Sequence, residues 1–150
     1  MQSVEQFLEQ GSRVFRRKAT DQAAVETHLG DSDNWRKKAV DKKESPNVRV
    51  DSAYDAVYLG ALALLNMNGF VVTSERGHHA EPLEAACRIL GASQGVFDRV
   101  TALKDARDHK YDGVKRTLAD AEAGASVMEE FCVLLGAWME NNRNPKRQQR

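Results

Sequence analysis

The segment from Ser52 to Leu65 is apolar around most of its circumference when it is placed on a helix. One broad face holds Ala53, Tyr54, Val57, Tyr58, Ala61, Leu62 and Leu65, and Ala56, Leu59, Ala63 and Leu64 fill much of the other side. A helix that is hydrophobic on all sides must be enclosed by other elements. We therefore predict a central helix from Asp51 or Ser52 to about Asn68, ended by Asn68-Gly69.

Three further segments have helical periodicity and follow one another closely. They cover about His78 to Leu90, Gln94 to Tyr111 and Lys115 to Glu140. Short connections favour antiparallel neighbours, so the expected fold is all-α: an antiparallel up-and-down four-helix bundle with extra N-terminal helical segments. Phe70 to Val72 has the composition of a strand. No partner strand is evident, however, and an isolated strand would not be stable.

The first fifty residues are more polar and less regular. They suggest a short helix interrupted by Gly11, a turn or two over Ala23 to Leu29 ended by Gly30, and a helix over Trp35 to Lys43 capped by Asp31-Ser32-Asp33. We therefore predict three parts: a peripheral helical segment over residues 1–49, the bundle over 50–140, and a disordered basic tail over 141–150.

Composition limits the classes of protein that this chain can belong to. The chain has 150 residues, 41% hydrophobic and 29% charged, with a formal net charge of zero. These values suit one soluble globular domain and give no global field that would attract RNA or acidic lipid. No apolar run reaches the roughly eighteen residues of a membrane span, and no signal peptide is evident. We expect a cytoplasmic protein without membrane contact.

Neither a cofactor nor a metal site is expected from motifs. Cys87 and Cys132 lack metal-ligand spacing and are expected to be reduced core residues. The chain contains no phosphate-binding GxxxxGKS/T loop, no GxGxxG and no GxSxG. Any chemistry must therefore come from side chains that do not belong to one of these motifs.

The helix over Gln94 to Tyr111 carries the most unusual pattern. Its stripe consists of Phe97, Val100, Leu103, Arg107 and Tyr111, which recur at steps of three and then four. An unpaired charge on an apolar face is costly, so Arg107 needs a partner. Two interpretations are open. Arg107 and Tyr111 make structural contacts, for example with Asp55 or Glu84, or they belong to a functional site.

A second candidate lies where the helix over His78 to Leu90 begins. Free backbone N–H groups gather at a helix N-terminus, so Arg76-Gly77-His78-His79 is suited to contact phosphate. Adjacent histidines do not have the spacing of helix-borne zinc ligands. A solvated loop is the alternative interpretation. Tyr54 and Tyr58 are expected to be core aromatics.

The order of these features resembles the HEPN superfamily (higher eukaryotes and prokaryotes nucleotide-binding domains), in particular its small bacterial members. The resemblance covers roughly residues 51–140 and rests on four features. They are the Ala/Tyr/Leu-rich helix, the Gly69-Phe70 turn, Arg76-Gly77-His78-His79, and the arginine-containing helix that ends in Tyr111-Asp112-Gly113. It implies a homodimer through the Arg107 helix, binding of RNA or nucleotide, and a nucleotidyltransferase-like partner. Many such proteins are metal-independent endoribonucleases of toxin–antitoxin systems.

The family's Arg-polar-x(n)-His motif carries over in part. Arg107 matches the arginine, Asp108 the small polar residue, and Tyr111 stands near the place of the histidine. His109 is close in sequence but lies about 200° around the helix from Arg107. The candidate catalytic residues are therefore Arg107, Asp108, His109 and Tyr111, and the candidate phosphate-binding residues are Arg76, His78 and His79. The alternative function is a noncatalytic helical interaction or assembly module that works through a protein partner.

Overall fold

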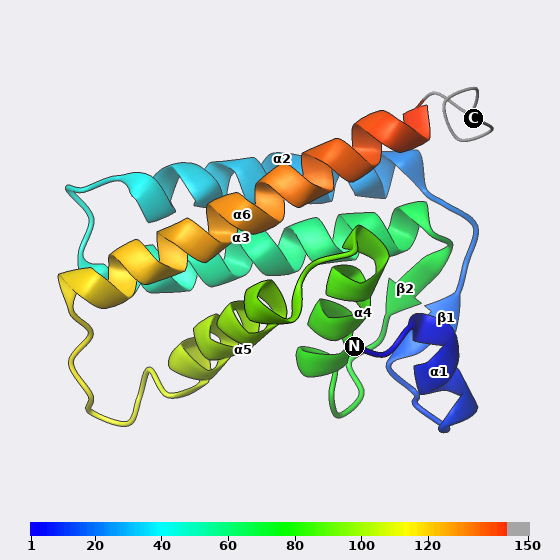
Figure 1. Ribbon diagram of the computed structural model, residues 1–150, viewed down its shortest axis with the longest axis horizontal. Coiled ribbons are helices and arrows are strands. Elements are labelled where there is room, and N and C mark those ends of the chain that lie inside the picture. The colour runs from blue at the N-terminus through cyan, green and yellow to red at the C-terminus, as the bar shows by residue number, and fades with distance from the viewer. Residues whose placement is uncertain (144–150) are drawn as a thin grey trace.

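The computed structural model describes residues 1–143 of the chain. Within this range it contains six helices and one two-stranded sheet (Figure 1). The elements are α1 (Val4–Glu9), β1 (Phe15–Arg17), α2 (Gln22–Val40), α3 (Pro46–Met67), β2 (Phe70–Val72), α4 (Ala80–Leu90), α5 (Gln94–Asp108) and α6 (Leu118–Arg143). The expected all-α helical bundle is confirmed.

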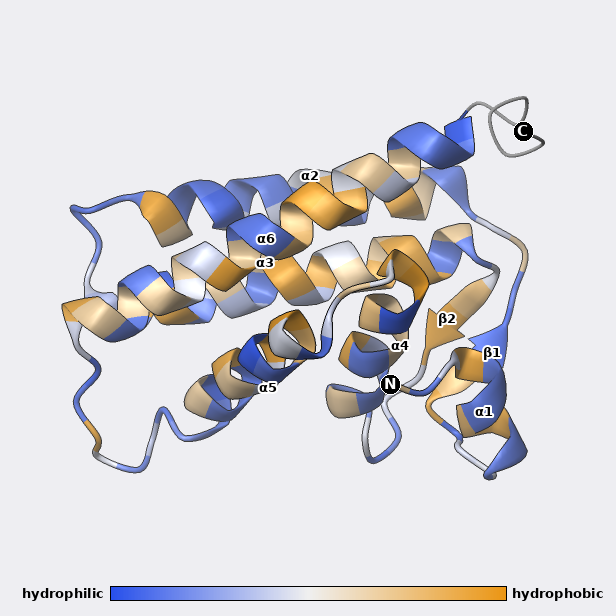
Figure 2. Ribbon diagram, in the orientation of Figure 1, coloured by the Kyte–Doolittle hydropathy of each residue, from blue (hydrophilic) through white to orange (hydrophobic). Residues whose placement is uncertain are grey.

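Helix α3 occupies the centre of the bundle. It contacts α2, α4, α5 and α6, and α2 runs opposite to both α3 and α6 (Figure 1). Helix α4 crosses the direction of α3 in this view. Its N-cap residue, His79, lies 2.7 Å from the hydroxyl of Tyr54 in α3. The ribbon of α3 is mostly hydrophobic, whereas that of α2 is mostly hydrophilic (Figure 2). This distribution explains why α3 is the enclosed helix.

The start of α3 lies five residues before the predicted one. Ser45 is the N-cap, its Oγ accepts a hydrogen bond from the Val48 backbone N–H, and Pro46 occupies the first turn. Proline is favoured there because its fixed φ suits the helix and its missing N–H is not needed. Residues Ala53, Tyr54 and Val57 are at most 1% exposed, so the predicted central position is confirmed.

The predicted break at Gly11 is confirmed, because α1 ends at Glu9 and Gly11 has a φ of 86°. The predicted break at Gly30 is wrong. Helix α2 is continuous from Gln22 to Val40 and passes through Gly30, where an added Cβ would meet nothing within 4 Å. The expected cap at Ser32 does not form. Instead Ser32 is buried and its hydroxyl donates a 2.7 Å hydrogen bond to the Ala56 carbonyl of α3. Packing against α3 therefore outweighs the weak local stop signals.

The short strand over Phe70–Val72 does have a partner. It pairs antiparallel with β1, with Phe15 opposite Val72 and Arg17 opposite Phe70. A second, small core lies beneath this sheet and consists of Val4, Phe7, Val14, Phe15, Leu65, Phe70 and Ala85. The pairing joins the N-terminal segment to the end of α3, a contact between residues more than fifty positions apart in the sequence.

The C-terminal helices also differ from their predicted limits. Helix α5 ends at Asp108 with His109 as its C-cap, three residues before Tyr111. Helix α6 begins at Leu118 and continues to Arg143, so the predicted disordered tail begins too early, and residues 144–150 lie outside the described range. No helix within residues 1–143 is both long enough and apolar enough to cross a membrane.

Candidate functional site

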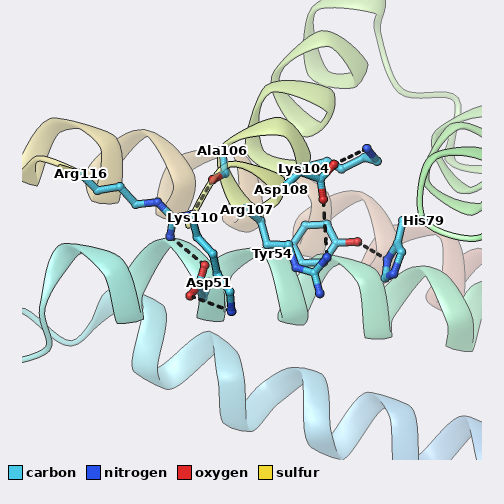
Figure 3. Close-up of polar contacts among 9 residues, drawn as sticks. All are labelled: Asp51, Tyr54, His79, Lys104, Ala106, Arg107, Asp108, Lys110 and Arg116. Atoms are coloured by element: carbon cyan, nitrogen blue, oxygen red, sulfur yellow. Dashed lines mark hydrogen bonds and ion pairs between the residues drawn. The ribbon is translucent and has the colours of Figure 1, made fainter. Parts of the chain in front are cut away.

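Three separate segments meet at the side chain of Tyr54. The Tyr54 hydroxyl lies 2.7 Å from Nδ1 of His79, at the N-cap of α4, and Cζ of Arg107, in the last turn of α5, lies 5.2 Å from the centre of the Tyr54 ring (Figure 3). We call Tyr54, His79 and Arg107 the Tyr54 cluster. It joins an arginine and a histidine that are 28 residues apart in the sequence.

Two tyrosine hydroxyls of α3 fix the beginning of α4. Besides the Tyr54 contact, the Tyr58 hydroxyl donates a 2.6 Å hydrogen bond to the His78 carbonyl. The two phenol rings stack with an interplanar angle of 12°, and the Tyr58 ring centre lies 4.9 Å from that of His79. Nδ1 of His78 donates to the Glu75 carbonyl at 3.0 Å. The two imidazoles are therefore held in defined positions against α3.

The guanidinium of Arg107 has few partners of its own. Among the described residues, the hydrogen bond recorded for it goes to Oδ1 of Asp108 at 3.5 Å, which is at the limit for such a bond. Asp108 makes its shorter contact with Lys104, at 2.6 Å. The Arg107 side chain is 35% exposed, and a guanidinium carries five N–H donors. The Tyr54 ring supports the cation by a cation–π contact, and most of the donors have no hydrogen-bond partner among the described residues.

Burial and the positive neighbours set the charge states around the cluster. Burial, together with the charges of His78 and Arg107, lowers the pKa of His79 below its usual 6.5, so this imidazole is neutral at pH 7. Burial raises the pKa of the Tyr58 phenol to about 12 and also raises the pKa of Tyr54, so both phenols are neutral. At Asp108, burial opposes ionisation, but the hydrogen bonds from Lys104 and Arg107 lower its pKa overall.

A buried arginine ties the end of α5 to α3. Arg116 is only 8% exposed, and it donates a 2.7 Å hydrogen bond to Oδ1 of Asp51 and a further one to the carbonyl of Ala106, the residue before Arg107 (Figure 3). Nζ of Lys110 lies 3.9 Å from the same carboxylate. We call Arg116, Asp51 and the Ala106 carbonyl the Arg116 clamp. It holds the backbone that carries Arg107.

The structure brings together some of the predicted site residues and separates others. Arg107 and Asp108 lie near His79 at the N-cap of α4, which the sequence had assigned to a different group. Tyr111 does not share the helical face of Arg107, because α5 has ended, and its side chain is 86% exposed. His109 is exposed and its Nδ1 lies 2.6 Å from Asp112, and Arg76 is exposed on the loop before α4.

The predicted alternative partners of Arg107 do not hydrogen-bond to it. Glu84 instead accepts a hydrogen bond from the backbone N–H of Gln2 at 3.2 Å. Asp55 interacts with Arg107 only through its charge: burial raises the pKa of Asp55, and Arg107 opposes that rise. Thus the contact that holds Arg107 is chiefly the Tyr54 ring and not an acid.

Tyr54 is the residue that sequence reasoning missed. Its expected burial is confirmed at 1% exposure, but its hydroxyl and ring face each contact a candidate site residue. A buried phenol needs a hydrogen-bond partner for its hydroxyl, and this need is a signal present in the sequence. The sequence does not show which residue is that partner, because the partner lies at the start of another helix.

Comparisons of the chain with protein-family models, curated proteins and solved structures give no match. Within residues 1–143, no three His, Cys, Asp or Glu side chains are grouped so that they could hold a metal ion.

Proposed function

We propose that this chain is an HEPN-like protein that binds phosphate groups of RNA or nucleotide at the Tyr54 cluster and acts as a metal-independent endoribonuclease. The observation that carries the proposal is the state of Arg107. Its guanidinium is held in place by an aromatic ring, yet most of its donors have no protein partner in the described structure. Such a guanidinium is suited to contact two phosphate oxygens at once.

The neighbouring imidazoles supply the proton transfers that RNA cleavage needs. With its proton on Nδ1, His79 donates to the Tyr54 hydroxyl and leaves Nε2 free to accept the proton of a ribose 2′-hydroxyl. The 2′-oxygen then forms a bond to phosphorus, the bond from phosphorus to the 5′-oxygen breaks, and the 5′-oxygen takes a proton from His78. The product end is a 2′,3′-cyclic phosphate. Arg107 stabilises the charge on the phosphate during this step.

The resemblance also implies partners. We propose a homodimer through α5, in which the two copies of Arg107 face a shared cleft, and a nucleotidyltransferase-like protein as the partner of a toxin–antitoxin pair. Sedimentation of the purified chain tests the dimer, since a monomer at all concentrations would contradict it. Co-purification with a nucleotidyltransferase-like protein encoded beside the chain tests the second partner.

The experiment for the proposed function is incubation of the purified protein with structured RNA in the presence of a chelator. Wild type should cleave the RNA and leave 2′,3′-cyclic phosphate ends, whereas Arg107→Ala and His79→Ala should lose most of the activity. Arg99→Ala is the matched control, because Arg99 lies on the same helix but its guanidinium is paired with Glu130 at 2.6 Å.

The outcomes separate the proposal from its alternative. Cleavage that survives in Arg107→Ala would place the activity elsewhere. If wild type neither cleaves nor binds RNA, the noncatalytic interaction module is the better description. Circular dichroism and urea unfolding of each variant show whether a loss of activity reflects a loss of folding.

A further inference from the structure

We infer that Tyr111 is a stacking platform for a nucleobase and that the ligand of the Arg107 site is therefore a single-stranded RNA rather than a duplex. This inference rests on the proposed function. It gives a role to Tyr111, which lies beyond the end of α5 and therefore outside the predicted helical stripe. The argument depends on the exposure of Tyr111, the anchoring of its loop and the charges beside it.

The exposure of Tyr111 is unusual for a tyrosine. Its side chain is 86% exposed, the highest value among the exposed large hydrophobic residues described. Tyrosines are commonly at least partly buried, since the ring has a large apolar surface. With the side chain 86% exposed and Nζ of Lys110 over the ring, Tyr111 still offers ring surface on which another flat, aromatic group can stack.

The loop that carries Tyr111 is anchored on both sides. Before it, the backbone N–H of Lys110 donates to the Arg107 carbonyl at 3.3 Å, so the chain continues α5 by a tight turn. After it, the N–H of Asp112 donates to the His109 carbonyl at 3.1 Å, and the Arg116 clamp fixes the chain to α3. A platform that is already held in place loses little conformational entropy when a base stacks on it.

The charges around Tyr111 fit the backbone of a nucleic acid. Nζ of Lys110 lies 5.0 Å from the centre of the Tyr111 ring, Lys115 is exposed on the same loop, and Arg107 is four residues earlier in the sequence. Aromatic rings interspersed with cations are how proteins hold single strands, since each base offers a π-face and each phosphate a charge. In a duplex the base faces are already stacked and cannot reach Tyr111.

Binding of a fluorescent 2′-O-methyl RNA, which cannot be cleaved through its 2′-oxygen, tests the inference by fluorescence anisotropy. Wild type should bind the single strand more tightly than a duplex of the same length. Tyr111→Ala should weaken single-strand binding by roughly 5- to 150-fold. Tyr111→Phe should keep it, because the ring is retained. Val114→Ala is the matched control, since Val114 is 72% exposed on the same loop and has no π-face.

Each outcome has a distinct meaning. If Arg107→Ala weakens binding but Tyr111→Ala does not, the inference is wrong and the proposed phosphate site stands. If Tyr111→Ala weakens binding but Arg107→Ala does not, the platform is supported and the phosphate site is wrong. A loss in Val114→Ala equal to that in Tyr111→Ala would indicate a general apolar contact and overturn the inference. Failure of wild type to bind either RNA would overturn both.

Discussion

At the scale of single residues, Tyr54 serves two neighbours with two different parts of its side chain. Its hydroxyl is the partner of His79, and its ring face supports Arg107. The same burial that makes the ring part of the core also keeps the phenol neutral, since it raises the phenol pKa. A core residue thereby sets the position of both candidate functional groups.

The protonation of His79 should make the stability of the fold depend on pH. The pKa of His79 is lower in the folded chain than its usual 6.5, so between these two values the unfolded chain binds the additional proton. Stability is therefore fully present above pH 6.5 and decreases as the pH falls through the folded pKa. Urea unfolding at about pH 7.5 and about pH 5 should show a larger loss for wild type than for His79→Gln.

The control for this prediction is His28→Gln. His28 lies on α2 and is not among the hydrogen-bond and ring partners of His79, so this variant shows whether replacing a histidine outside the Tyr54 cluster changes the pH dependence. If His79→Gln and wild type lose the same stability, the proton responsible is bound at another group, and the neutral state of His79 at pH 7 loses its support.

The candidate site could be predicted from the sequence only in pieces. The helical pattern of residues 97–107 correctly indicated that Arg107 continues an apolar stripe, and the position of the paired histidines before a helix was also correct. Their proximity was not predictable, because it depends on how α4 and α5 pack against α3. Tyr111 was assigned to the stripe by spacing alone, although polar residues at helical spacing do not show that the helix continues.

At the scale of elements, the Arg116 clamp should contribute more to stability than an exposed ion pair. Arg116 is buried and joins α5, α3 and the loop between α5 and α6, whereas the side chains of Arg99 and Glu130 are 53% and 42% exposed. Arg116→Met leaves a partly buried carboxylate and a carbonyl without their donor, and should cost about 2–4 kcal/mol. Arg99→Met should cost less than about 1 kcal/mol. Urea unfolding of both variants measures the difference, and equal losses would contradict it.

Substitution by alanine should change the stability of the protein in opposite directions at two glycines, Gly30 and Gly69. Gly30 lies inside α2 with open space around it, so Gly30→Ala should stabilise the protein by about 0.5–1 kcal/mol. Gly69 has φ +85°, and an added Cβ there would meet only ordinary contacts, so strain comes from the backbone. Gly69→Ala should destabilise by about 1 kcal/mol or more. Thermal unfolding tests both, and a destabilised Gly30→Ala would show that α2 is broken at this position.

The same glycines show how far the elements could be predicted. Gly69 was correctly expected to follow a helix end, and it has a positive φ. At Gly30 the expectation failed because the contacts of α2 with α3, and not the local residues, decide that the helix continues. The expectation that Phe70–Val72 has no partner strand was wrong for a related reason. Phe15 and Val72 pair across the molecule, and neither segment carries a local signal that identifies its partner.

At the scale of the whole molecule, charge balance determines what kind of nucleic-acid binding is possible. The chain has 22 Lys and Arg residues and 22 Asp and Glu residues, so its formal net charge is zero. Near the Tyr54 cluster, Lys104 and Lys110 are paired with Asp108 and Asp51. Binding at this site must therefore depend on a few local cations and on stacking, because no long-range field attracts the strand.

This balance predicts a weak dependence of RNA binding on salt. Each phosphate contact on a single strand contributes a slope of about −0.7 to the logarithm of the binding constant against the logarithm of salt concentration. With only Arg107 and one or two nearby lysines involved, the slope should be about −1 to −2, and Arg107→Ala should reduce its magnitude by about 0.7. Titrations of the 2′-O-methyl strand at several salt concentrations measure this slope.

A slope steeper than about −4 would mean that many cations act together. In that case a chain ending at Arg143, which lacks Lys146, Arg147 and Arg150, shows whether those residues supply the contacts.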